Sequence, residues 1–196
     1  MEARGSPKGA WILASLALGL ALGIVPCSGE SDFGVLPVLI LGLGAVQSLV
    51  LRGSVRAWRW GLATTLGLIV AVPFGYAAAI AVFGGLSTLL RPSTDPDFGP
   101  LLVLGVAAGA GALGLVLGAA QVKLAVRGGH LRIWMLASAG GVIAASPIAL
   151  AITCSDVIAV AGLSLGRPLV TSLGGLGYGL VTSLALPRLV HGGQHT

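Results

Sequence analysis

The chain has 196 residues, of which 56% are hydrophobic and only 9% are charged, with a formal net charge of +5. A soluble protein of this size needs a polar surface, and charged residues usually make up about a quarter of its composition. An ordinary soluble domain is therefore excluded, and the cations are too sparse for a nucleic-acid-binding surface. We expect an all-α integral membrane protein whose main partner is the lipid bilayer, because lipid-facing surfaces need no such polar cover.

Six stretches without an ionisable side chain follow one another along the chain, each close to the about 20 residues that a spanning helix needs. We expect six transmembrane helices in a single membrane domain covering residues 1–196. The stretches are Gly9–Gly29, Phe33–Leu51, Trp60–Leu90, Phe98–Val122, Ile133–Ser155 and Pro168–Pro187. A shorter apolar stretch, Val157–Gly166, is predicted to lie at the outer interface.

The basic residues separate the connecting segments into two classes. Lys and Arg in short loops stay on the cytoplasmic side of a membrane. If the N-terminus is inside, only Arg91 and Arg167 fall outside, and the other cations are cytoplasmic: Arg4, Lys8, Arg52, Arg56, Arg59, Lys123, Arg127, Arg132 and Arg188. We therefore expect a multi-pass protein of the cell membrane with both termini in the cytoplasm.

The four tryptophans fall at the same inner ends of the predicted spans. An indole suits the membrane boundary because its ring is apolar while its N–H stays wet. We expect an interfacial position for all four, namely Trp11, Trp58, Trp60 and Trp134.

Glycines recur one helical turn apart within the predicted spans. Small residues at this spacing let helix backbones approach closely where no hydrophobic drive brings helices together. Close helix contacts are expected at Gly19/Gly23, Gly105/Gly109, Gly114/Gly118 and Gly175/Gly179.

An internal repeat relates two parts of the chain, because residues 44–73 align with 118–147 without a gap. Identical pairs include Gln47/Gln121 and Trp60/Trp134. Each unit is an even-numbered helix, a basic loop and an odd-numbered helix, so the two units are parallel repeats. Two interpretations remain for the rest of the chain. Residues 179–196 together with 7–26 form a split third copy, in which Thr182 stands at the Gln position, and the sixth and first helices then pack together and close a six-helix ring. Alternatively, there are two true repeats and two unrelated flanking helices.

The segment Gln47-Ser48-Leu49-Val50-Leu51-Arg52 ahead of Trp60 resembles a pattern in uncharacterised bacterial multi-pass membrane proteins. Those proteins repeat a Gln-Trp-x-x-Leu-Arg segment ahead of a Trp-led helix. Here Ser48 and Val122 replace the Trp after Gln, and Val126 replaces the Arg of the second copy. The resemblance covers most of the chain and implies no known activity.

The most polar side chains within the predicted spans are the candidate site residues. Gln47, Gln121 and Thr182 are expected to make intramembrane polar contacts, either as hydrogen bonds between helices or as contacts to a substrate or lipid headgroup. Both cysteines, Cys27 and Cys154, fall on the predicted outer side. There they either form a disulfide or remain two separate small apolar residues.

Catalytic and metal-binding patterns are missing from the sequence, which has no His-Glu-x-x-His, no phosphate-binding loop and no Gly-x-Ser-x-Gly. We therefore expect neither an enzyme nor a cofactor. The first functional expectation is a non-enzymatic structural or interaction subunit that packs with other membrane proteins or with itself. The alternative is a passive channel or transporter for a small neutral solute, lined by the three candidate polar residues.

Overall fold

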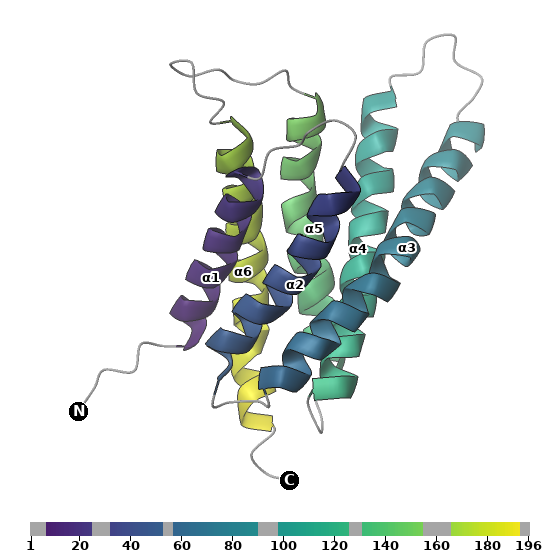
Figure 1. Ribbon diagram of the computed structural model, residues 1–196. Helices are drawn as coiled ribbons and strands as arrows, with labels where there is room; N and C mark the ends of the chain where they lie inside the picture. Colours follow the sequence, from purple (N-terminus) through teal and green to yellow (C-terminus); the bar gives the residue numbers. More distant parts are fainter. Residues whose placement is uncertain are drawn as a thin grey trace.

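The computed structural model describes residues 7–24, 32–52, 57–89, 98–125, 131–154 and 166–192. Each of these segments is α-helical over all or nearly all of its length, which confirms the all-α fold class for the described part of the chain (Figure 1). The helices are α1 (Pro7–Ile24), α2 (Asp32–Val50), α3 (Ala57–Leu89), α4 (Phe98–Ala125), α5 (Leu131–Cys154) and α6 (Gly166–Gly192). The stretch expected at the outer interface lies outside the described residues except for Gly166, where α6 begins.

The six helices form a closed ring. Each helix packs against the next one in the chain and α6 packs against α1, whereas the backbones of other helix pairs in the described segments stay apart. The expected contact between the first and last helices is therefore present. Successive helices run in opposite directions, so α1 begins and α6 ends at the same end of the bundle, which we call the terminal end (Figure 1).

Glycines on the even-numbered helices bring the ring together at three equivalent contacts. Gly44 of α2 faces the backbone of Gly61 on α3, Gly118 of α4 faces Met135 on α5, and Gly179 of α6 faces Ile12 on α1. In each case the glycine stands three residues before a candidate polar residue and faces the residue that follows a Trp. Without a side chain at these glycines, the backbones approach closely enough for extensive van der Waals contact.

The remaining seams alternate with these three, and they are not alike. Gly67 of α3 meets Leu117 of α4, with a Cβ added at Gly67 falling 3.1 Å from the leucine Cδ1. Gly141 of α5 packs in the same way on Tyr178 of α6. At the equivalent place on α1 the chain has Leu18, and Gly42 of α2 meets only its side-chain tip. The α1–α2 seam therefore lacks the close backbone approach of the others.

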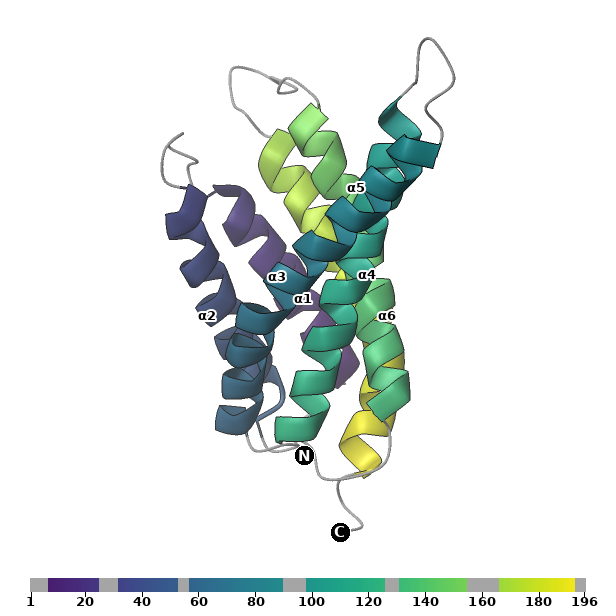
Figure 2. The ribbon, with the colours of Figure 1, turned by 90° about the vertical axis from the view of Figure 1, so that its right-hand side faces the viewer.

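The third and fourth helices are the longest part of the ring. α3 has 33 residues, which corresponds to about 50 Å of helix. It lies close to α2 at the terminal end and diverges from it toward the other end, as both views show (Figures 1 and 2). It stays against α4 beyond that divergence, where Gly75 and Gly109 face each other's backbone.

Two helices of the described chain are long and apolar enough to cross a membrane, judged by length and composition alone. They are α3 and the part of α4 from Leu101 to Ala125. Shorter apolar helical stretches cover Lys8–Leu20, Leu41–Val50 and Leu131–Ser146. These findings give weak support for membrane association.

Candidate functional site

Three hydrogen bonds of one kind join the helices in pairs across the centre of the ring. The Trp60 indole Nε1–H donates to Gln47 Oε1 at 3.1 Å, joining α3 to α2. The Trp134 Nε1–H donates to Gln121 Oε1 at 2.8 Å, joining α5 to α4. The Trp11 Nε1–H donates to Thr182 Oγ1 at 2.8 Å and joins α1 to α6. Each candidate polar residue is thus the acceptor for one tryptophan on the neighbouring helix.

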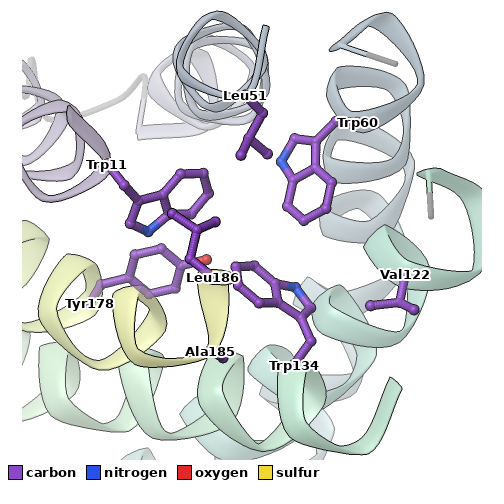
Figure 3. Close-up of a cluster of buried hydrophobic side chains, with 8 residues drawn as sticks. All are labelled: Trp11, Leu51, Trp60, Val122, Trp134, Tyr178, Ala185 and Leu186. Carbon is purple, nitrogen blue, oxygen red and sulfur yellow. The ribbon is translucent and has the colours of Figure 1, made fainter. Parts of the chain in front are cut away.

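The three indoles meet on the ring axis, where each contacts both of the others edge to face. Their centroids are 6.4 Å apart for Trp11 and Trp60, 6.0 Å for Trp11 and Trp134, and 5.4 Å for Trp60 and Trp134. This geometry places the positive edge of one ring against the negative face of another, and each such pair contributes about 0.5–1.5 kcal/mol beyond area burial. Figure 3 shows the rings pointing inward from the surrounding helices. All three are at most 1% exposed, so they fill the centre of the bundle at this level.

Gln47 is the centre of a polar network that connects two of these pairs, its own and that of Gln121. Its Oε1 also accepts from Gln121 Nε2 at 3.1 Å and from the Thr64 hydroxyl at 3.4 Å. Gln121 Nε2 donates a second bond to Thr64 Oγ1 at 3.0 Å, and Gln47 Nε2 reaches the Tyr178 hydroxyl at 3.5 Å. Four helices, α2, α3, α4 and α6, therefore meet in one set of buried side-chain hydrogen bonds.

Apolar side chains cover the network toward the terminal end. Leu51 follows Gln47 by one helical turn and Leu186 follows Thr182 by one turn, and both are fully buried. Together with the indoles they form one cluster, completed by Val122, Tyr178 and Ala185 (Figure 3). Because water is kept from the network on this side, its polar groups rely on one another.

Hydroxyl residues stand one turn after each tryptophan and behave differently in the three pairs. Thr64 belongs to the network, and Ser15 donates to the Trp11 carbonyl at 3.0 Å. Ser138 is fully buried, and its hydroxyl has no hydrogen-bond partner in the described part of the chain. It lies in the α4–α5 seam, since a Cβ at Gly118 would lie 3.0 Å from its Oγ.

The water-exposed N–H expected for the tryptophans is wrong for three of the four. Trp11, Trp60 and Trp134 lie inside the ring with their N–H groups bonded to side chains rather than to water. The indoles can be buried because the neighbouring helix provides a hydrogen-bond acceptor for each N–H at the same level. Trp58 alone is largely exposed, at 66%.

A signal for this arrangement was present in the sequence. In both units the Gln precedes the Trp by 13 residues. Residues equally far from the middle of a tight helical hairpin lie at the same level of its two helices, so the two side chains come within reach. The pair between Trp11 and Thr182 offers no such signal, because no short loop joins α6 to α1.

The disulfide between Cys27 and Cys154 stays a prediction, because Cys27 lies outside the described residues. Cys154 is the last residue of α5. No group of three His, Cys, Asp or Glu side chains with the geometry of a metal site is found within the described segments.

Comparison with protein-family models, with curated proteins and with solved structures finds no match to this chain.

Proposed function

We propose that the chain is a six-span integral membrane protein of the cell membrane with both termini in the cytoplasm. The distribution of side chains supports this, because the outside of the bundle is largely apolar, unlike that of a soluble bundle. The interior holds Gln47, Gln121, Thr64 and Thr182, whereas the large exposed side chains on all the helices are predominantly leucine, isoleucine, valine and aromatic residues. In water such a surface would drive aggregation, and in lipid it is the favoured one.

The shorter helices are compatible with six spans. α1 and α2 contain 18 and 19 residues, which correspond to about 27 and 29 Å of helix. The hydrocarbon core of a bilayer is about 30 Å thick, so helices of this length cross it with little tilt. The longer α3 requires a tilt, an extension beyond the bilayer, or both.

The ring is best explained as three copies of one two-helix unit, the third being split between the chain ends. Its support is the equivalence of contacts: a glycine three residues before the polar residue, the polar residue itself, and the indole that it accepts from recur in α2–α3, α4–α5 and α6–α1. A single two-helix unit cannot bury its own polar side chain, and only the closed ring buries the polar side chains of all three units.

Within this setting the function that we propose is that of a non-enzymatic structural or interaction subunit. The observation that carries it is the closed centre, where the indoles fill the axis, Gln47, Gln121 and Thr182 each accept from one indole, and the two glutamines bond to one another. A passive channel for a small neutral solute needs the same side chains to face a pore. Their mutual bonding favours the structural proposal over the channel.

One face of α3 supports an interaction role. Ala77, Ala81 and Gly85 lie one turn apart, and all three are exposed. Nothing lies within 4 Å of a Cβ added at Gly84 or Gly85. Small residues in this pattern are the usual contact surface between helices in lipid.

Purification from native membranes in a mild detergent, followed by mass spectrometry, tests the proposal. A defined protein partner, or a defined homo-oligomer, is the expected result. The test variant is Gly85→Leu, which should release the partner while leaving the monomer folded. If the protein stays monomeric and carries solute flux in proteoliposomes, the result favours the passive channel over the interaction subunit.

A further inference from the structure

At the terminal end of the bundle, all the charged side chains that the structure describes are positive. Lys8, Arg52, Lys123 and Arg132 are exposed, and Arg59 is half-buried. No described carboxylate lies at this end to neutralise them. The positive charge is therefore available to a partner of opposite sign.

Within this end, the corner between α2 and α3 is distinct. It carries Arg52 and Arg59 together with Trp58, the exposed tryptophan. The guanidinium of Arg59 lies over the Trp58 ring, 5.4 Å from its centroid. Such stacking fixes the planar donor group of an arginine while leaving its N–H edge free to bind an anion.

The buried core holds the two arginines at the same corner. Arg52 directly follows Leu51, and Arg59 directly precedes Trp60, and both of these neighbours belong to the central cluster (Figure 3). The Arg52 backbone N–H also donates to the Leu49 carbonyl at 3.2 Å, which fixes the chain where it leaves α2. The core thus fixes the chain at Arg52 and at Arg59, and the guanidinium of Arg59 lies over an exposed indole.

The fold itself does not require this combination, because the equivalent corner between α4 and α5 lacks it. Trp58 and Arg59 correspond there to Arg132 and Ile133, and Arg52 corresponds to Val126. The same helix pairing forms at both corners, with its Gln–Trp hydrogen bond intact. Fixing the orientation of the chain in a membrane needs positive charge alone, and it needs neither an exposed tryptophan nor a guanidinium stacked on it.

We propose that the α2–α3 corner is a binding site for an anionic phospholipid of the cytoplasmic leaflet. Arg52 and Arg59 bind the headgroup phosphate, since guanidinium and phosphate form paired, charge-assisted hydrogen bonds. Trp58 packs beside the glycerol and upper acyl chain, which is where an amphipathic indole lies in a bilayer. This inference rests on the six-span orientation proposed above.

Native mass spectrometry of the full chain in a neutral detergent tests the site by comparing bound phosphatidylglycerol with bound phosphatidylcholine. The wild type should prefer phosphatidylglycerol. Each basic residue near an anionic headgroup is worth about fivefold in affinity, so Arg52→Gln with Arg59→Gln should weaken phosphatidylglycerol binding about 25-fold. The matched control is Lys123→Gln with Arg132→Gln, which removes the same charge at the other corner and should leave the preference intact.

Three results would overturn the proposal: equal binding of the two lipids by the wild type, an equal loss in the control pair, or displacement of the lipid by soluble glycerol phosphate at matched concentration. If the double variant does not fold, the exposed Arg52→Gln change alone should cost about fivefold, and unchanged affinity refutes the site. Resistance of the protein to extraction by alkaline carbonate is scored separately. Its release into the soluble fraction would reject the membrane proposal rather than the lipid site.

Discussion

At the scale of single residues, the pairing of Trp134 with Gln121 is expected to stabilise the ring, because it satisfies the buried indole N–H and the buried amide oxygen. Gln121→Leu removes the acceptor of the indole and two donors to the network, so we expect a loss of about 1–2 kcal/mol in stability. Thermal unfolding in detergent, followed by the near-ultraviolet signal of the indoles, measures it.

A double-mutant cycle isolates the bond itself. Trp134→Phe combined with Gln121→Leu removes both partners, so the double variant should be more stable than the sum of the single losses implies, by about 1 kcal/mol. Strict additivity of the two losses would mean that the hydrogen bond contributes nothing.

The third pair makes a further prediction at this scale. Thr182→Val keeps the volume of the side chain but leaves the Trp11 N–H without its acceptor. We expect a loss of about 1 kcal/mol, again measured by thermal unfolding. The comparison is Thr88→Val on α3, where the exposed hydroxyl bonds only to a carbonyl of its own helix; this change should leave the unfolding temperature nearly unchanged.

Part of this site could be predicted from the sequence, and the rest could not. The polar residues were identifiable because amides are rare in apolar stretches, and the repeat related Gln47 to Gln121. The tryptophans were misassigned because an indole near a helix end fits the interface as well as a core, and only the facing helix decides between them. The network through Thr64 and Tyr178 was not anticipated, since single hydroxyl groups occur throughout the chain.

At the scale of helices, glycines determine how closely neighbouring helices pack. Gly114 lies in a tight contact between two helices, whereas Gly85 faces open space and provides a control. A Cβ at Gly114 would lie 2.5 Å from the Ala139 Cα, which is backbone and cannot move aside. Gly114→Leu should therefore separate α4 from α5 and abolish the folded monomer in size-exclusion chromatography. Gly85→Leu makes the same substitution on α3 where nothing lies within 4 Å, and the monomer should stay folded.

The glycine spacings predicted these contacts well. Gly105, Gly109, Gly114 and Gly118 all face a neighbouring helix at short distance. The same holds for the α1–α6 seam at Gly19, Gly175 and Gly179, whereas the surroundings of Gly23 lie outside the described part of the structure. The looser α1–α2 seam was not foreseen, because one leucine in place of a glycine is unremarkable in an apolar helix. The leucine in place of a glycine can be interpreted only when the ring shows which positions of the helices are equivalent.

At the scale of the whole molecule, the proposed orientation can be tested loop by loop. Alkaline phosphatase is active only outside the cytoplasm, so fusions after Asp32 and Asp97 should be active. Fusions after Arg56, Arg127 and Thr196 should be inactive, because their flanking basic residues keep those segments inside. Strong activity after Arg56 or Arg127 would reverse the proposed topology.

The bond between Trp11 and Thr182 spans 171 residues of chain, and this separation has a consequence for synthesis. α1 leaves the ribosome first, whereas α6 leaves last. At about 5–20 residues per second, α1 waits roughly 10–30 s for its partner. In the proposed six-span topology, two complete hairpins, α2–α3 and α4–α5, can already pair within the bilayer during that interval. On this proposal the nascent chain passes through a stage with two finished units and an unpaired first helix, and release of α6 from the insertion machinery is the step that closes the ring.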